Sequence, residues 1–410
     1  MAMSKVLLVA LLIAVCTTVA SAQDCDENRR CGDSRCCSQY GYCGCTIDYC
    51  GSGCKSQCNS CGGGGAAPTI GVCYGVLGDN LPSHSQVVAL LKSRGVSNVK
   101  IYDAAHDVLQ AFANSGIDLS VAVPNQEVRT VADSQDAANG WVQDNIRRFV
   151  GATKIGSIAV GNEYLTDSRN DPSKLLPAMQ NIQRALEGQG LGNIKVSTPH
   201  EFGVVDISFP PSAGTFKGNY INVMRGILEF LRQKNSVFMV NIYPFFAYRF
   251  NSGQINLDYA LFNPNAPPIS DSGRTYRNLF DAQVDSVIAA MNRLGYGNLP
   301  LMITESGWPS GGGGVGAGVS NAKTYNNNLV KHVLQNGTPM RPGDRIPTYI
   351  FALFNENKKG GDAIETNFGL FFPDQRPVYD INLSATVSRP HNASAMDIDQ
   401  AALVEPLAVE

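Results

Sequence analysis

Eight short runs rich in β-branched and aromatic residues recur along the chain, and longer segments with a different pattern separate them. Runs of this kind are typical of buried β-strands. The predicted strands are residues 69–76, 98–104, 118–125, 155–163, 194–199, 236–245, 300–308 and 347–356.

Between these runs, apolar residues recur with the spacing of amphipathic helices. The predicted helices cover residues 84–95, 106–116, 141–151, 175–190, 222–235, 279–295 and 325–337. In five of them we expect the final glycine to adopt the left-handed conformation that closes a helix. These glycines are Gly95, Gly116, Gly190, Gly295 and Gly337.

Strands that alternate with helices indicate βαβ units and a parallel sheet. Eight strands with seven clear helices predict a (β/α)8 barrel, with a doubly wound open sheet as the alternative. In either architecture, functional groups gather at the carboxyl ends of the strands. The polar residues found at these ends are Tyr74, Tyr102, Asp103, Asn125, Asn162, Glu163, Tyr243, Glu305, Asn355 and Glu356.

Two of these strands end in a glutamate, in the sequences "VGNE" and "ITESGW". A single such glutamate is more often a rim residue paired with lysine or arginine, but Glu163 and Glu305 follow the fourth and seventh strands and can meet across a barrel. Two carboxyl groups about 5 to 5.5 Å apart can cleave a glycosidic bond with retention, one as nucleophile and one as acid/base. Asn162 could then donate a hydrogen bond to the sugar 2-hydroxyl.

The amino terminus has the features of a secretory signal peptide. Lys5 precedes an apolar run, and Ala20-Ser21-Ala22 is a small-x-small cleavage pattern, so residues 1–22 are predicted to be removed. The apolar run is too short for a membrane anchor.

Cysteines are concentrated near the amino terminus. Of the twelve, one lies in the signal peptide, ten lie between Cys25 and Cys61, and only Cys73 lies beyond. In a secreted protein this predicts a disulfide-stapled domain at residues 23–61, with zinc binding as the alternative. Cys73 is expected to be a buried free thiol. A Gly-rich linker, residues 62–67, leads to the large domain, residues 68–384.

The small domain contains large aromatic side chains but has hardly any core to hold them. Such side chains either cover the disulfides or stack on sugar rings beside a hydroxyl that can form hydrogen bonds. The residues concerned are Ser38, Tyr40, Tyr42 and Tyr49.

The run "CCSQYGYC" followed by "YC" resembles the hevein-like chitin-binding family, in which these four positions bind N-acetylglucosamine oligomers. The resemblance implies the disulfides Cys25–Cys37, Cys31–Cys43, Cys36–Cys50 and Cys54–Cys58. The chain departs from the family in a short first loop and in two extra cysteines. For these two we predict a fifth bridge, Cys45–Cys61.

The large domain resembles the plant endo-1,3-β-glucanases of glycoside hydrolase family 17. The resemblance is carried, in order, by "TIGVCYGV", "VGNE", "VNIYPFFAYR", "ITESGWPSGG" and "FALFNENKKGGDAIETNFGLF". It implies a (β/α)8 barrel and a retaining mechanism, with Glu305 as nucleophile and Glu163 as acid/base. It further implies a charged cluster near the nucleophile and aromatic cleft walls. With Asn162, the expected substrate-binding residues are Tyr74, Tyr243, Phe354, Glu356, Lys359 and Glu365.

Several features limit the partners. The net charge of −3 gives no broad electrostatic footprint for nucleic acid or a membrane surface. The five histidines are scattered without the spacing of metal ligands, so no metal is expected. The G-x-G-x-x-G spacing that begins at Gly311 lacks the downstream acidic residue of a dinucleotide site, so no cofactor is expected either. The segment is expected to be a mobile rim loop. Phe245 stands where family members often carry tyrosine, which puts a hydroxyl contact in the cleft in doubt. Asn336, Asn382 and Asn392 head glycosylation sequons.

Together these features predict a secreted, monomeric endo-hydrolase of 1,3-β-glucan, tethered to chitin-containing walls and acting in antifungal defence. The alternatives are a mixed-linkage 1,3-1,4-β-glucan hydrolase and a non-catalytic carbohydrate-binding protein. A chitinase is disfavoured because the chain lacks the D-x-x-D-x-D-x-E strand of chitinase barrels. Residues 385–410 resemble a removable vacuolar extension, so the protein is expected outside the cell or in the vacuole.

Overall fold

The computed structural model describes residues 70–383 continuously and, before them, residues 25, 31, 36–37, 43–44 and 54–56. Several predictions fall outside the described residues. These are the signal peptide, the linker, the C-terminal extension, the sugar-binding positions Ser38, Tyr40, Tyr42 and Tyr49, the sequon at Asn392, and most of the small domain's disulfide pairing.

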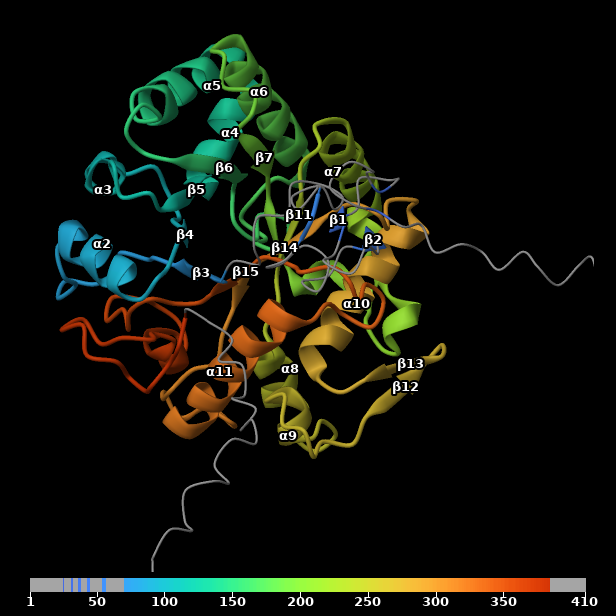
Figure 1. The fold of residues 1–410 in the computed structure, drawn as a ribbon. Coiled ribbons are helices and arrows are strands. Elements are labelled where there is room, and N and C mark those ends of the chain that lie inside the picture. Colours follow the sequence, from blue (N-terminus) through green and yellow to red (C-terminus); the bar gives the residue numbers. More distant parts are fainter. Residues whose placement is uncertain are drawn as a thin grey trace, which may run out of the picture.

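Eight parallel strands form a closed barrel at the centre of the molecule (Figure 1). The sheet order is β7-β6-β5-β4-β3-β15-β14-β11-β8, and every pairing in it is parallel. Only Thr198 separates β7, which pairs with β6, from β8, which pairs with β11, so the two form one strand and close the ring. The (β/α)8 prediction is therefore confirmed, and the open sheet is excluded.

The predicted strands all occur, although each regular segment is shorter than its sequence run. They are β3 (Ile70–Cys73), β4 (Asn98–Lys100), β5 (Asp118–Val123), β6 (Ile155–Val160), β7 (Lys195–Ser197), β8 (Pro199–Glu201), β11 (Phe238–Asn241), β14 (Leu301–Ser306) and β15 (Thr348–Ile350). Residues of these runs beyond the carboxyl end of each regular strand belong to the loop that follows it.

All seven predicted helical segments are helical, and Figure 1 shows them around the strands. The α-helices are α2 (His84–Ser93), α3 (His106–Ala111), α4 (Asn125–Asp133), α5 (Gln135–Val142), α6 (Leu175–Gly188), α7 (Ile221–Gln233), α8 (Pro244–Phe250), α9 (Leu257–Ala260), α10 (Leu279–Arg293) and α11 (Val319–Gln335). The segment predicted at 141–151 begins in α5 and continues as a π-helix, Gln143–Arg147.

Some elements were not predicted. Pro244 begins α8, which ends the strand expected at 236–245 early, because a proline cannot donate to a strand ladder. Two antiparallel hairpins lie in the loops, β9 (Val205–Ile207) with β10 (Thr215–Phe216), and β12 (Ile269–Asp271) with β13 (Arg274–Tyr276). Short 3₁₀-helices cover Pro172–Lys174, Phe202–Val204, Pro211–Ala213, Gly218–Tyr220 and Ala363–Asn367.

Four of the five predicted helix-ending glycines have the expected positive φ, between 69° and 88°. They are Gly95, Gly116, Gly190 and Gly295. The prediction is wrong for Gly337, where α11 passes instead into extended backbone at Asn336. Glycine is required there for space, because a Cβ would lie 2.0 Å from the carbonyl oxygen of Arg341.

The core of the large domain comprises more than one apolar cluster. Ala122, Ala159 and Met239 form a buried cluster of their own, and a much larger apolar cluster includes residues of both strands and helices. Trp308 belongs to this larger cluster, is fully buried and donates its indole N–H to the carbonyl of Gly316 at 2.7 Å. Within the described residues, no helix has the length and apolar character needed to cross a bilayer.

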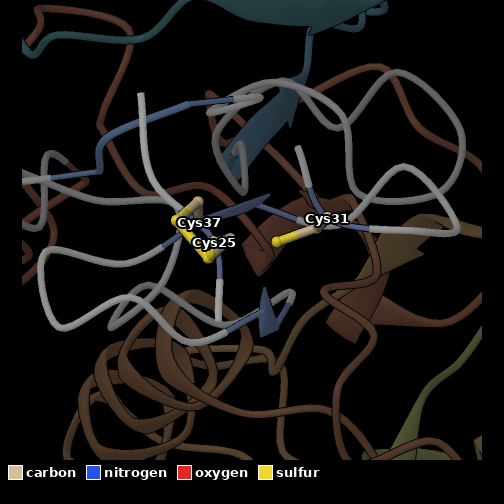
Figure 2. Close-up of side chains that lie close together, drawn as sticks. All are labelled: Cys25, Cys31 and Cys37. Carbon is tan, nitrogen blue, oxygen red and sulfur yellow. A yellow bond between two sulfur atoms is a disulfide. The ribbon is translucent and has the colours of Figure 1, made fainter. Parts of the chain in front are cut away.

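The described part of the small domain contains a disulfide between Cys25 and Cys37 (Figure 2). This bridge is the first of the five expected pairs. The sulfur of Cys31 lies within 4.8 Å of both, a spacing that could suggest a metal site. All three cysteines are disulfide-bonded, however, so they offer no thiolates to zinc. Cys73 is a buried free cysteine, as predicted.

Candidate active site

Glu305 lies one residue before the carboxyl end of β14, and only 5% of the residue is exposed. Its carboxylate receives three donors. The Nζ of Lys100 lies 2.7 Å from Oε1, and the hydroxyl of Tyr102 donates to the same oxygen at 2.9 Å. The hydroxyl of Tyr243 donates to Oε2 at 2.7 Å. Both carboxylate oxygens are therefore held by the protein, which fixes the side chain in one orientation.

Burial alone would raise the pKa of Glu305, because a charged group loses its hydration in the interior. The positive charge of Lys100 and the hydrogen bonds from Lys100, Tyr243 and Tyr102 outweigh burial and hold the pKa below its usual range. Glu305 is thus an ionised carboxylate at neutral pH, as a nucleophile requires.

Lys100 is one of two functional residues that the sequence prediction missed; the other, Asn241, holds Glu163. Lys100 is the last residue of β4, is 1% exposed, and also donates from Nζ to Oδ1 of Asn162 at 2.8 Å. A lysine is almost never fully buried without a partner. The signal was therefore visible in "NVKIYDA", where a lysine interrupts an apolar strand two residues before Tyr102.

Glu163 follows β6 and has a less polar environment. Its backbone adopts φ of 54°, uncommon for a residue with a side chain, and its N–H donates to the carbonyl of Pro199 at the start of β8. The only hydrogen bond that its carboxyl group receives from the described residues comes from Nδ2 of Asn241, at 2.8 Å. No cation contacts Glu163 within this part of the chain.

Asn241 connects the two carboxyl groups. It ends β11 and lies in register with Glu305 on the neighbouring strand, while its side chain reaches Glu163. The hydroxyl of Thr304 donates to its Oδ1 at 2.7 Å, which turns the NH₂ group towards Glu163. The carboxyl ends of β11 and β14 and the residues that follow β6 thus bring the predicted catalytic residues together at one end of the barrel.

The pKa of Glu163 is raised to about 7. Burial is the main cause, and the negative charge of Glu305 adds to it, while the hydrogen bond from Asn241 and the charge of Lys100 act in the opposite direction. Near neutral pH a large fraction of Glu163 is therefore protonated beside an ionised Glu305. Two carboxyl groups with opposed pKa shifts can serve as acid and nucleophile.

Asn162 is half-buried between Lys100 and Asn125. Asn125 holds its backbone from both sides, accepting from the N–H at 2.8 Å and donating to the carbonyl at 2.9 Å. Because the Oδ1 of Asn162 accepts from Lys100, its Nδ2 remains available as a donor beside Glu163. This arrangement is compatible with the expected contact to a sugar hydroxyl.

The predicted charged cluster lies beside this pair. Glu356 is 2% exposed, accepts the N–H of Leu77 at 2.7 Å and forms an ion pair with Lys359 at 3.4 Å. The Nζ of Lys359 also lies 3.9 Å from the ring centre of Phe351, in a cation–π contact. Burial, opposed by the charge of Lys359, raises the pKa of the half-buried Glu365, and the charge of Glu305 adds to the rise.

Tyr243 is partly exposed and makes edge-on contacts with Phe246, Phe351 and Phe368. These rings fix its orientation while its hydroxyl holds Glu305. The structure thus places Tyr243 at the site.

Tyr74 and Phe354 require a correction. They are 1% and 2% exposed and pack edge-on against each other, so neither offers a surface to a sugar. The hydroxyl of Tyr74 lies 2.7 Å from Nδ1 of His84, away from the two glutamates. Phe245 is fully buried against Trp308, so a tyrosine hydroxyl at this position would not face an open cleft.

Backbone hydrogen bonds hold both ends of the glycine-rich loop, residues 311–318. The N–H of Ser310 donates to the carbonyl of Asn367, and that of Gly318 donates to Pro309. A Cβ on Gly312, where φ is 90°, would lie 2.5 Å from the backbone of Ile364. Part of the loop therefore packs closely on the segment that carries Glu365, and its mobility stays a prediction.

Two of the three sequon asparagines are described, and both Asn336 and Asn382 are exposed. Thr338 of the first sequon, however, is 2% exposed. Use of these sites stays a prediction.

Comparison with protein families divides the chain into the same two parts as its cysteine distribution, a small amino-terminal domain and a large domain. Residues 70–383 match the family described as glycosyl hydrolases family 17, and residues 21–58 match the family described as chitin recognition protein.

Plant relatives resemble the larger part. The chain is 43% identical, over 337 residues, to a glucan endo-1,3-beta-glucosidase, basic vacuolar isoform, of Nicotiana plumbaginifolia, covering 82% of this chain and 91% of the relative. It is 46% identical to glucan endo-1,3-beta-glucosidase GII of Hordeum vulgare, covering 77% and 93%. For the longer glucan endo-1,3-beta-glucosidase 13 of Arabidopsis thaliana, identity is 41%, and the match spans 80% of this chain and 66% of the relative.

Solved structures extend the likeness to the fold. The chain is similar to CJP38, a beta-1,3-glucanase and allergen of Cryptomeria japonica pollen, with 54% identity and a TM-score of 0.75 over 77% of this chain and 99% of that one. A structure from a study of two plant beta-glucan endohydrolases with distinct substrate specificities gives 41% identity and a TM-score of 0.73, covering 76% of this chain and all of that one.

Proposed function

The chain belongs to glycosyl hydrolases family 17, and from that premise we propose that it hydrolyses internal linkages of 1,3-β-glucan with retention of configuration. The observation that carries the proposal is the contrast between Glu305, held ionised by Lys100 and two tyrosines, and Glu163, whose pKa is raised to about 7. Retaining glycosidases require this division between two carboxyl groups.

In the first step the carboxylate of Glu305 attacks the anomeric carbon. The glycosidic C–O bond breaks, and the proton of Glu163 passes to the leaving oxygen. A glycosyl ester on Glu305 results. Because the charge of Glu305 helps to raise the pKa of Glu163, forming the neutral ester lowers that pKa and prepares Glu163 to act as a base.

In the second step Glu163 takes a proton from water while the water oxygen attacks the anomeric carbon. The ester bond breaks and Glu305 leaves again as a carboxylate, stabilised by Lys100 and by the hydroxyls of Tyr102 and Tyr243. The Nδ2 of Asn162 is proposed to donate to the sugar 2-hydroxyl, a contact that strengthens as positive charge develops on the ring.

The small domain is proposed to act as a tether. The chitin recognition match at residues 21–58 supports binding to N-acetylglucosamine oligomers, and a tether raises the effective concentration of enzyme on walls that contain both chitin and 1,3-β-glucan. We propose that the protein follows the secretory route to the vacuole or the cell exterior, works as a monomer in antifungal defence, and binds neither nucleic acid nor membranes.

Product analysis tests the activity. Purified protein is incubated with laminarin, barley mixed-linkage glucan and chitin, and the anomer first released is identified by NMR. We expect internal cleavage of laminarin with the β-anomer formed first, and a loss of about four orders of magnitude in kcat for Glu305→Gln. Preferential cleavage of barley glucan would favour the mixed-linkage alternative. Equal, background-level sugar release by wild type and Glu305→Gln would favour a non-catalytic binding protein.

The tether has a separate test. Deleting residues 23–61 should leave hydrolysis of soluble laminari-oligosaccharides unchanged while reducing retention on chitin-containing wall particles. Replacing Tyr42 by alanine in the full chain provides a smaller matched change. An equal loss of activity on soluble and particulate substrates would contradict the tether.

A further inference from the structure

Glu201 is an exposed carboxylate at the barrel rim to which no role has been given. It is the last residue of β8 and lies in register with Asn241 on β11, which in turn lies in register with Glu305 on β14. Three neighbouring strands therefore end in a row of two glutamates with an asparagine between them. Glu305 and Asn241 already belong to the site, so the third member of the row borders it.

Glu201 lies on the side of Glu163. Glu163 donates its backbone N–H to Pro199, two residues before Glu201 on the same strand, at 2.9 Å. The strand formed by β7 and β8 lies directly beside β6, the strand that Glu163 follows. It is separated from β14, the strand of Glu305, by β11. Consistent with this position, the charge of Glu201 is one of the causes that raise the pKa of Glu163.

The carboxylate of Glu201 has no internal partner in the described part of the chain. No hydrogen bond or ion pair to its side chain occurs among residues 70–383, whereas Glu305 and Glu356 are each paired with a lysine. The missing side chain of Gly203 leaves room for the carboxylate of Glu201, since a Cβ on Gly203 would lie 3.2 Å from both carboxylate oxygens. A carboxylate without an internal partner keeps several acceptor positions open towards the solvent.

We propose that Glu201 binds the leaving-group sugar, accepting hydrogen bonds from its hydroxyls. Glu163 must deliver its proton to the leaving oxygen, so the sugar that departs lies on its side of the bond being cleaved. An exposed carboxylate, that of Glu201, ends the adjacent strand on that side. Hydrogen bonds from hydroxyls to an ionised acceptor are stronger than those between neutral groups. This inference rests on the proposed glucan hydrolysis and adds a residue that selects the leaving group.

The test compares two substrates in the full-length protein. Laminarihexaose places a sugar on the leaving-group side, whereas a 4-nitrophenyl laminari-oligosaccharide cleaved at its aryl bond places there a ring without hydroxyls. Glu201→Ala should lower kcat/KM on the hexaose by about tenfold to a hundredfold and change it less than twofold on the aryl substrate. Asp206→Asn, a neutralisation of another exposed acid in the next strand, is the matched control and should change neither.

A pH profile on the hexaose provides a second readout. The charged or titratable groups near Glu163 are Glu305, Lys100, Tyr243 and Glu201. Glu201→Gln removes one negative charge, so the pKa of Glu163 falls and the high-pH side of the profile moves to lower pH, whereas Asp206→Asn leaves it in place.

The outcomes separate this inference from the proposed function. If the wild-type protein cleaves both substrates and Glu201→Ala cleaves the hexaose at the wild-type rate, the inference is overturned and the proposed function stands. Equal losses on hexaose and aryl substrate would also overturn it, because they indicate general damage to the site. A wild-type protein that cleaves neither substrate would remove the proposed function and this inference with it.

Discussion

The ends of β6 and β14 carry the same residue type in different environments. At the end of β14, a cation and two phenols hold Glu305 and keep its pKa low. Beyond β6, Glu163 receives one amide hydrogen bond, and burial raises its pKa to about 7. The contrast shows that the role of each glutamate is set by the donors its neighbouring strands supply.

Those donors come from different parts of the chain. Lys100 ends the second barrel strand, and Tyr243 follows the sixth, so only barrel closure brings them to Glu305. Asn241, from the sixth strand, reaches across to Glu163. The asymmetry is therefore a property of the closed barrel, and changing its donors one at a time should weaken it by different amounts.

The largest effect is expected from removing the cation. Lys100→Met leaves Glu305 buried without its positive partner, so the pKa of Glu305 rises and the low-pH side of the kcat/KM profile moves to higher pH. Activity should fall about a hundredfold, the usual loss when one charge-stabilising donor is removed from a buried active site. The measurement is a pH profile on laminarin. Lys100→Arg keeps the charge and should keep the wild-type low-pH side; an unmoved low-pH side in Lys100→Met would show that the lysine does not set this pKa.

A smaller effect is expected at the other strand end. Asn241→Ala removes the hydrogen bond that lowers the pKa of Glu163, so this pKa rises and the high-pH side of the profile moves to higher pH. The value of kcat should fall about tenfold, because the acid loses its fixed orientation. Thr304→Val, which only releases the amide of Asn241, should shift the profile in the same direction by less. Movement to lower pH would contradict the assigned hydrogen bond.

The smallest effect is expected from Tyr74→Phe. This tyrosine directly follows the first barrel strand, but its hydroxyl contacts His84 and neither glutamate. The change should leave KM and the pH profile at wild-type values and lower the free energy of unfolding by about 1 kcal/mol, the net value of a hydrogen bond. Steady-state kinetics and denaturant unfolding measure the two quantities. A severalfold rise in KM would restore Tyr74 as a substrate-binding residue.

Much of the fold was readable from the sequence, because each buried strand and amphipathic helix leaves a local pattern. The eight strands and the seven long helical segments follow from apolar periodicity alone. Elements such as the β12–β13 hairpin were missed, since their residues are largely exposed or half-buried and carry little pattern. The prediction for Gly337 was wrong because a glycine is required there to avoid a steric clash with the backbone of Arg341, a contact that the local sequence does not show.

The site was only partly predictable. Strand ends point to Glu163 and Glu305 because carboxyl termini of parallel strands meet at one face. Which side chain at a strand end faces its partner, and which turns into the core, depends on local register shifts such as that between Val240 and Asn241. Tyr74 and Lys100 illustrate the two errors, since one strand-end aromatic lies in the core and one strand lysine lies in the site.

The most direct measurement traps the intermediate. A 2-deoxy-2-fluoro laminaribiosyl fluoride slows both steps of a retaining enzyme, the second more than the first, so the glycosyl ester accumulates and can be located by peptide mass mapping. If the donors around β14 select the nucleophile, the label appears on the peptide that contains Glu305, and Lys100→Met accumulates it more slowly. A label on Glu163, or steady turnover with no labelled peptide, would contradict the division of roles between the two strand ends.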